Sequence, residues 1–327
     1  MRIVLIVFCI LLTNVSCKNR KESAEFFTRG NFHFKKKEFD KAEHFFSEAI
    51  KKDPELADAY NNRGLIYLQW GRLEEAGEDF KKAVELDRTF TDAHFNLAKW
   101  YSETGNTEKA QSLLDGLQSK LDTSSSYWNA VGQNYILQNK FQEGEERLKK
   151  AIEFSPQYVE ALTNLGYVYL VQYRDKEAEV VLDKALAIQP DFVYALNNRA
   201  VLYGRKREFE KGLELLHMAE KKDPQALFVL NNLVLFNIES GKAIEGENIQ
   251  RRAEVLDDED PYVKRNAGLI LFQKGLYAEA MKVWEEIERT HPEVDYLYYF
   301  LSKGAVKLGQ SADKYIKMAQ SLKDPWI

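Results

Sequence analysis

Residues 57–88 read ADAYNNRGLIYLQWGRLEEAGEDFKKAVELDR, and this stretch decides the fold. Small residues (Gly64, Ala76) and large apolar residues (Tyr67, Phe80) recur at the spacing of helical faces, which predicts two helices joined by a short turn. The same skeleton returns when the window moves by about 34 residues in either direction. A fixed period of this size is typical of a stacked array of helical repeats.

Eight such repeats cover residues 23–294 without an insertion. They begin at Ser23, Ala57, Thr91, Ser125, Val159, Val193, Leu227 and Pro261. Position 20 is Ala or Gly in every repeat, and position 8 is Gly or Ala in all but one, so the two backbones can approach closely there. Proline often occupies position 32, where it ends the helical pair. We expect Gly71 and Gly105, at position 15, to take the positive φ of a helix end.

These residues at these spacings resemble the tetratricopeptide repeat family. The resemblance implies an all-α fold, a right-handed superhelical solenoid of stacked antiparallel helix pairs, in which the first helix of each repeat lines a concave groove. After Pro292 the register falters, so residues 295–327 are predicted to form an imperfect ninth repeat or capping helices. We expect the tail at Trp326 to pack on that cap.

The N-terminus has a different composition from the repeats. A charge at Arg2, an apolar run over residues 3–12 and a small-residue boundary indicate a secretory leader over residues 1–16. Cys17 after Ser16 resembles the lipobox of bacterial lipoproteins, although Asn14 stands where an aliphatic residue is usual. The resemblance implies a lipid on Cys17, a short tether over residues 17–22, and delivery to the outer rather than the inner membrane. The alternative is a leader that is cleaved with nothing attached.

The sequence carries no pattern of an enzyme. It has no glycine-rich phosphate loop, its five histidines lack metal-ligand spacing, and the hydrophobic leader contains one of the two cysteines. We therefore expect no catalytic residues, no metal and no cofactor. With 46 basic and 51 acidic residues interleaved and a net charge of −5, nucleic acid is not an expected partner either.

The informative residues lie on the other face of each first helix, at positions 2, 6, 9 and 13, which form one stripe. Position 6 is asparagine in six of the eight repeats: Asn62, Asn96, Asn164, Asn198, Asn232 and Asn266. An amide offers both a donor and an acceptor, which match a peptide backbone. This arrangement resembles the asparagine ladder of some peptide-binding members of the family. The alternative is that these amides bond to polar groups of neighbouring helices.

Aromatic residues join the stripe in the later repeats. Position 2 becomes Tyr194, Phe228 and Tyr262, and position 9 of the fifth repeat is Tyr167. Aromatic anchors are enriched where proteins bind partners, so these residues predict an apolar and aromatic end of the groove. The alternative is that they pack between adjacent repeats.

These features predict a membrane-tethered adaptor that binds an extended segment or helix of a protein partner in its groove. Its layout is similar to that of repeat lipoproteins which assist pilus secretin assembly or recruit cell-wall hydrolases. A glycan- or peptidoglycan-binding subunit of an envelope enzyme complex is the second hypothesis. The family's carboxylate clamp is not assembled, because only its asparagines, Asn31 and Asn62, are present.

Overall fold

The computed structural model describes the backbone of residues 2–327 and the side chains of residues 19–327. Over this range the chain is all-α, with 18 helices in stacked antiparallel pairs, which confirms the predicted fold class. The side chain of Cys17 lies outside the described residues. The chain divides into two compact units, an N-terminal unit of residues 1–154 and a C-terminal unit of residues 155–327, which are described separately.

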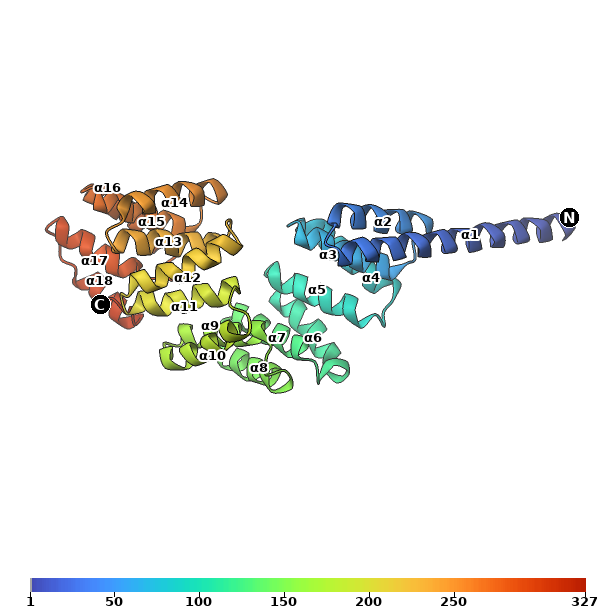
Figure 1. Ribbon diagram of the computed structural model, residues 1–327, viewed down its shortest axis with the longest axis horizontal. Coiled ribbons are helices and arrows are strands. Elements are labelled where there is room, and N and C mark those ends of the chain that lie inside the picture. The colour runs from blue at the N-terminus through green and yellow to red at the C-terminus, as the bar shows by residue number, and fades with distance from the viewer. Residues whose placement is uncertain (1) are drawn as a thin grey trace. The chain divides into compact units, whose positions relative to one another are not determined.

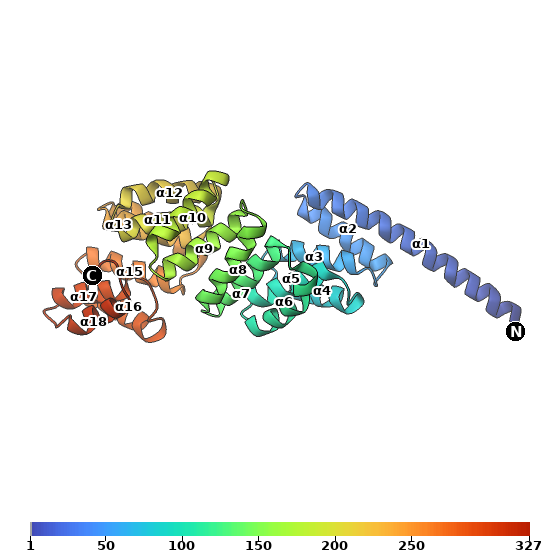
Figure 2. The same ribbon diagram turned by 90° about the horizontal axis from the view of Figure 1, so that it is seen from below.

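The N-terminal unit contains four helix pairs (Figures 1 and 2). Its helices are α1 (Arg2–Lys35), α2 (Phe39–Lys52), α3 (Ala57–Gln69), α4 (Leu73–Leu86), α5 (Thr91–Glu103), α6 (Thr107–Leu121), α7 (Ser125–Leu137) and α8 (Phe141–Phe154). Helix α1 is continuous, so the predicted leader and tether both fall within it, and it extends well beyond its partner α2 (Figure 2). Within the part of the chain that the structure describes, no helix is long and apolar enough to cross a bilayer.

The C-terminal unit contains five helix pairs (Figure 1). Its helices are α9 (Val159–Val171), α10 (Asp175–Ile188), α11 (Val193–Arg205), α12 (Phe209–Lys222), α13 (Leu227–Glu239), α14 (Ala243–Leu256), α15 (Pro261–Gln273), α16 (Tyr277–Thr290), α17 (Leu297–Lys307) and α18 (Asp313–Ser321). From α3 to α15, every first helix of a pair begins at one of the repeat starts given above. Helices α17 and α18 form a shorter pair after the eighth repeat.

Close packing inside each pair explains the small residues. A Cβ placed on Gly64 would lie 2.8 Å from the ring of Phe80, and one on Gly30 would lie 2.5 Å from the ring of Phe46. Both phenylalanines have no exposed surface. The aromatic residue at position 24 therefore needs a glycine opposite it, because real Cβ contacts are never that short.

All eight turns within the repeats place position 15 in the left-handed region. Gly71 and Gly105 have φ values of 72° and 78°, as the sequence predicts. The fifth repeat uses Tyr173 instead, with φ of 58°, which is an uncommon conformation for a bulky residue. The side chain of Tyr173 takes part in the candidate site described below.

First helices form the inner layer of each unit. In the C-terminal unit, α9 contacts α11, α11 contacts α13 and α13 contacts α15. Successive second helices, such as α10 and α12, make few contacts or none. Because the first helices lie closer together, their shared face is the concave one.

The last helix pair and the tail fold back onto earlier repeats of the same unit. The indole of Trp326 is buried, stacks on Tyr296 with ring centroids 4.0 Å apart, and donates to the carbonyl of Gly204 at 2.9 Å. The hydroxyl of Tyr173 donates to the carbonyl of Leu322 at 2.7 Å. The prediction that the tail packs on the cap is confirmed, and the tail also reaches the fifth and sixth repeats.

Candidate binding surface

The position 6 asparagines bond between repeats. The side-chain nitrogen of Asn96 donates to Oδ1 of Asn61 at 2.8 Å, and that of Asn232 donates to Oδ1 of Asn197 at the same distance. In both pairs the acceptor is position 5 of the preceding repeat. These two amides therefore hold neighbouring first helices in register, which is the alternative that the sequence left open.

Two asparagines deviate from this pairing. Asn62 donates to Asn31 at 2.9 Å, so the two asparagines that could belong to a carboxylate clamp bond to each other. Asn266 is fully buried, donates to the carbonyl of Asn231 and accepts from the guanidinium of Arg265. Asn266 is not presented to a partner, because its side chain has no exposed surface.

Partial exposure remains at the other position 6 amides. Asn62, Asn96, Asn164, Asn198 and Asn232 are half-buried. Asn198 has only one long contact, a 3.4 Å bond that it accepts from its neighbour Asn197. A primary amide has two donor hydrogens, so these side chains keep hydrogen-bonding capacity toward the concave face even where one donor is used.

The predicted aromatic stripe is open on α11 and α13. Tyr194 is 58% exposed, and its ring stacks on Phe228 with centroids 5.0 Å apart and an interplanar angle of 12°. Phe228 is half-buried beneath it. The pair therefore packs between adjacent repeats, as the alternative states, and also presents one aromatic face to solvent; that this face binds a partner stays a prediction.

Position 9 divides into open and closed residues along the C-terminal unit. Tyr167 is 43% exposed and Val201 is half-buried, whereas Leu235 and Leu269 have no exposed surface. Position 9 is therefore accessible at the fifth and sixth repeats and closed at the seventh and eighth. Tyr262, at position 2 of the eighth repeat, is half-buried, and the guanidinium of Arg265 lies 5.3 Å from its ring centroid.

A cavity of about 150 Å³ opens on this accessible part of the stripe. Val201 and Arg205, at positions 9 and 13 of α11, form one wall together with Tyr173. The segment of residues 293–298, which leads into α17, and the tail residues around Asp324 form the opposite wall. The concave face and the C-terminal cap therefore enclose a pocket inside the C-terminal unit.

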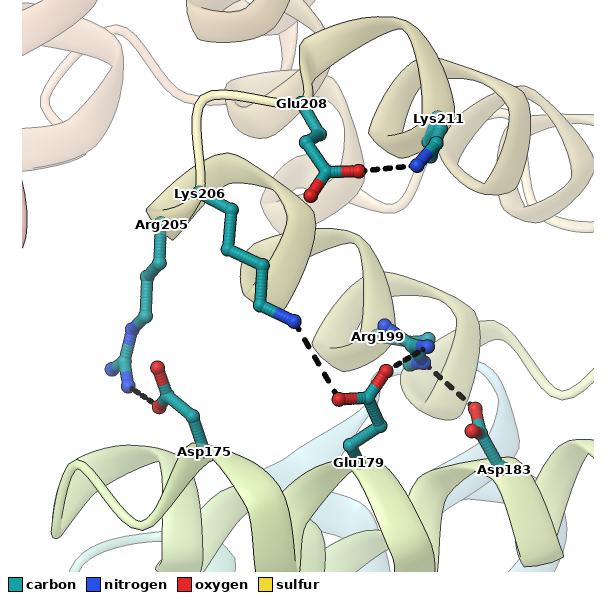
Figure 3. A network of polar contacts seen from close by, with 8 residues as sticks. All are labelled: Asp175, Glu179, Asp183, Arg199, Arg205, Lys206, Glu208 and Lys211. Atoms are coloured by element: carbon teal, nitrogen blue, oxygen red, sulfur yellow. Dashed lines mark hydrogen bonds and ion pairs between the residues drawn. The ribbon is translucent and has the colours of Figure 1, made fainter.

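The charge of Arg205 is already balanced. Figure 3 shows that α10 directs Asp175, Glu179 and Asp183 at α11. Arg205 forms an ion pair with Asp175 and also donates to the carbonyl of Leu170 at 2.8 Å. Arg199, which is almost fully buried, bridges Glu179 and Asp183 at 2.6 and 2.7 Å. These pairs fix α10 against α11, and Asp175 offsets much of the charge that Arg205 brings to the cavity.

The carboxylates of the cavity have weaker partners: Nδ1 of the exposed His291 lies 3.3 Å from Glu293, and the backbone N–H of Trp326 donates to Asp324 at 2.9 Å. Glu293, Asp295 and Asp324 line it, and the side chain of Asp295 forms no hydrogen bond or ion pair with the described residues. Asp295 is exposed to solvent, yet desolvation by the surrounding protein raises the pKa of its carboxyl, and Arg265 and Arg205 lower it. Burial also raises the pKa of Asp324, which the backbone N–H of Trp326 partly offsets.

Tyrosines gather around Asp295. Burial raises the pKa of Tyr167, Tyr262 and Tyr296, and the nearby Asp295 carboxylate raises each further. Tyr296 has a φ of 62°, the left-handed region that a large side chain rarely adopts. A residue stays in such a strained conformation only when the surrounding contacts hold it there, and residues of this kind cluster at functional sites.

The sequence predicted part of this surface. Four aromatic residues were expected on the stripe: Tyr194 and Phe228 stack on each other, and Tyr167 and Tyr262 lie near Asp295, while their role in binding stays a prediction. Asp295 and Tyr296 were missed, since they lie where the repeat register falters and no periodic signal marks them. Arg205, at position 13, belongs to the stripe but was not singled out. Among the described residues, no three histidine, cysteine or acidic side chains are placed to hold a metal ion.

Comparisons with known proteins place the chain among helical repeat proteins. Sequence profiles of the tetratricopeptide repeat match four stretches: residues 23–56, 57–90, 92–124 and 135–196. No curated protein sequence matches the chain.

Three solved structures share the fold. A tetratricopeptide repeat protein from Parabacteroides merdae is 17% identical, with a TM-score of 0.61 over 77% of this chain and 99% of that one. The pilF protein of Pseudomonas aeruginosa is 21% identical, with a TM-score of 0.51 over 64% of this chain and 95% of its own. A structure of the Cut9–Hcn1 hetero-tetramer of the APC/C is 13% identical, with a TM-score of 0.64 over 92% and 73%.

Proposed function

Because the chain is a tetratricopeptide repeat protein, a class that generally acts as a non-enzymatic protein–protein interaction scaffold, we propose that it binds a segment of a partner protein on its concave face. The observation that carries this proposal is the exposed aromatic pair on the C-terminal unit. Tyr194 presents an open ring face over Phe228, in line with the half-buried amides of Asn198 and Asn232. Aromatic anchors beside amide donors and acceptors match the side chains and the backbone of a bound peptide.

The N-terminal unit has a different surface chemistry at the same positions. Position 2 there is exposed in every repeat and carries a carboxylate in two of the four: Ala24, Asp58, Asp92 and Ser126. We therefore propose that the polar and acidic face of the N-terminal unit contributes little apolar anchoring, and that the C-terminal unit supplies most of the binding free energy. Hot spots in protein interfaces are usually aromatic and few, which supports this division.

We further propose that the scaffold is exported and tethered to the cell envelope. The support is in the sequence: an apolar leader followed by Ser16-Cys17. Lipid on Cys17 would hold the chain by its N-terminus at a membrane, since each buried methylene adds about 0.8 kcal/mol. Membrane fractionation of Cys17→Ser tests this step: release into the soluble fraction supports lipidation, and retention in the membrane contradicts it.

Site-specific photo-crosslinking tests the binding proposal. A benzoylphenylalanine at position 194 replaces one aromatic side chain by another on the concave face, and the same group at position 255 on α14 replaces a valine that is 86% exposed. We expect a discrete protein adduct in cells from position 194 and none from position 255. Equal labelling from the two positions, or none from either, would contradict a concave binding site.

The glycan hypothesis gives a different result in the same experiment. The open ring of Tyr194 is also suited to stacking on a sugar, so this observation supports a glycan as a second candidate. Adducts from position 194 that disappear after muramidase digestion, but survive protease digestion of the ligand, would favour a peptidoglycan partner.

A further inference from the structure

The cavity beneath the C-terminal cap differs chemically from the rest of the concave face. We propose that it is a specificity pocket which receives a lysine or arginine side chain of the bound segment. This inference rests on the proposed protein binding and names the residue type that the partner must supply.

Charge is the first argument. Three carboxylates (Glu293, Asp295, Asp324) line the cavity against one guanidinium, that of Arg205. Arg205 is paired with Asp175, and its guanidinium carbon lies 4.7 Å from the ring centroid of Tyr173. Carboxylates therefore outnumber guanidinium groups in the lining, although Arg265 and Arg207 also act on Asp295 and Asp324 from outside it, and a cation is the group that compensates the remaining negative charge.

The state of Asp295 is the second argument. Its carboxylate is exposed toward the cavity and forms no hydrogen bond or direct ion pair with the described residues; the guanidinium groups of Arg265 and Arg205 act on it only from a longer distance. Arg265, the nearest buried cation, donates to the backbone carbonyl of Asp295 at 3.0 Å and to Oδ1 of Asn266 at 2.8 Å, and not to the carboxylate. A partly desolvated carboxylate gains most from a charged donor that arrives with the ligand.

Shape and lining are the third argument. A volume of about 150 Å³ is that of a cavity able to hold a benzene-sized group, which is comparable to the stem of a lysine side chain. Val201, Val294 and Leu297 supply apolar wall for the methylenes, while the carboxylates reach the charged end. The rings of Tyr173 and Tyr296 add faces on which a cation is favourable.

The pocket is also rigidly built. Tyr296 is held in a left-handed conformation by its stack on Trp326, and Tyr173 is held by its hydrogen bond to Leu322. Both side chains are anchored before a ligand binds, and preorganisation of this kind lowers the entropic cost of binding. The indole N–H of Trp326, bonded to Gly204, lies directly behind Tyr296 and so provides a local reporter.

The test uses the full chain labelled with ¹⁵N and follows the indole resonance of Trp326 during titration. The probes are the N-acetyl N-methylamides of lysine and arginine, with those of norleucine and glutamate as matched neutral and acidic compounds. We expect saturable shifts with lysine or arginine and at least tenfold weaker responses with the other two. An equal response to norleucine would overturn the inference.

Two variants complete the test. Asp295→Asn removes the charge with little change of shape and is expected to lower the affinity for the lysine probe at least tenfold. Glu293→Gln is expected to lower that affinity less. The matched control is Asp258→Asn in the α14–α15 turn, which does not line the cavity and should leave the affinity unchanged. An unaltered affinity in Asp295→Asn, with the Trp326 resonance in its native position, would overturn the inference.

Failure of the pocket is distinguishable from failure of the binding proposal. If the lysine probe does not bind while position 194 still cross-links a protein, the proposal of a specificity pocket is contradicted and the proposal of protein binding is still supported. If the probe binds and Asp295→Asn removes it, but position 194 traps nothing, the cation site is supported and its protein partner is contradicted.

Discussion

The indole nitrogen of Trp326 donates a hydrogen bond of 2.9 Å to the carbonyl oxygen of Gly204, 122 residues earlier in the chain. Around this bond, the ring of Trp326 contacts Tyr296, Tyr299 and Phe209, and the guanidinium of Arg207 donates to the hydroxyl of Tyr299. In a repeat array most contacts join neighbours in sequence, so a contact of this range is unusual. It joins the cap directly to the sixth repeat.

Trp326→Ala is expected to destabilise the C-terminal unit by about 3–5 kcal/mol, because a buried tryptophan loses its packing and its hydrogen bond. Amide hydrogen exchange should speed up most in α17 and α18. Ile327→Ala, at a neighbouring residue that is 43% exposed, serves as the control and should change stability by less than about 0.5 kcal/mol. Unchanged protection of α17 and α18 in Trp326→Ala would show that the tail does not hold the cap.

Glycines of the N-terminal unit have opposite expected responses to alanine. In Gly64→Ala the new Cβ would lie 2.8 Å from the ring of Phe80, so we expect a loss of about 1–3 kcal/mol from overpacking. Gly116 lies inside α6 with no other atom near the position of its Cβ, so Gly116→Ala should add about 0.5–1 kcal/mol through helix propensity. Urea unfolding of the two variants measures both effects, and a shift of the same sign in each would contradict the packing argument.

These glycines also show how much of the fold the sequence determines. Gly64 and Phe80 face each other in the pair, and position 15 has positive φ in every repeat, because both features depend on local spacing that repeats in register. Local patterns of this kind suffice to predict the helices and their pairing. They do not reveal that Trp326 reaches Gly204, since that contact depends on how curvature accumulates over several repeats.

Some residues of the candidate site could likewise be predicted from the sequence, and others could not. Tyr194 and Phe228 could be found because they recur at one position of a regular repeat. Asp295 and Tyr296 could not, because the cavity depends on a left-handed residue where the register fails and on a tail that returns to α11. The hydrogen bonds of Asn266 could not be predicted from the sequence either. Its Oδ1 accepts from the guanidinium of Arg265, and no other repeat has an arginine at position 5.

The asparagine ladder is expected to contribute to stability as well as to binding. Asn232→Ala removes the donor to Asn197, a residue that is 8% exposed, and leaves a buried acceptor unpaired at a cost of about 1–3 kcal/mol. Asn198→Ala is the matched control, because its only hydrogen bond is long, and we expect it to cost less than about 1 kcal/mol. Chemical denaturation measures both; similar losses in the two variants would contradict the inter-repeat role of Asn232.

Tyr127 provides a pH-dependent test of packing in the N-terminal unit. It is 1% exposed, its hydroxyl donates to the carbonyl of Leu114 at 2.9 Å, and burial raises its pKa to about 12. Asp115 raises the pKa further and Arg147 lowers it, with a smaller contribution from Tyr135. Because the unfolded chain releases this proton near pH 10 and the folded chain only near 12, the folded state binds more protons between these values. Stability is therefore complete below pH 10 and falls as the pH rises toward 12, by about 2 kcal/mol from this group.

Tyr127→Phe isolates that contribution. At pH 8 the variant should be less stable by about 1 kcal/mol, because it lacks the hydrogen bond to Leu114. At pH 11.5 the variant has no phenol to ionise in the unfolded state, so the difference between the two proteins should vanish or reverse. Urea unfolding at the two pH values measures the difference, and absorbance titration of the phenolates should show one late-titrating tyrosine missing from the variant. A difference that stays constant from pH 8 to 11.5 would mean that Tyr127 ionises as readily in the folded unit as in the unfolded chain.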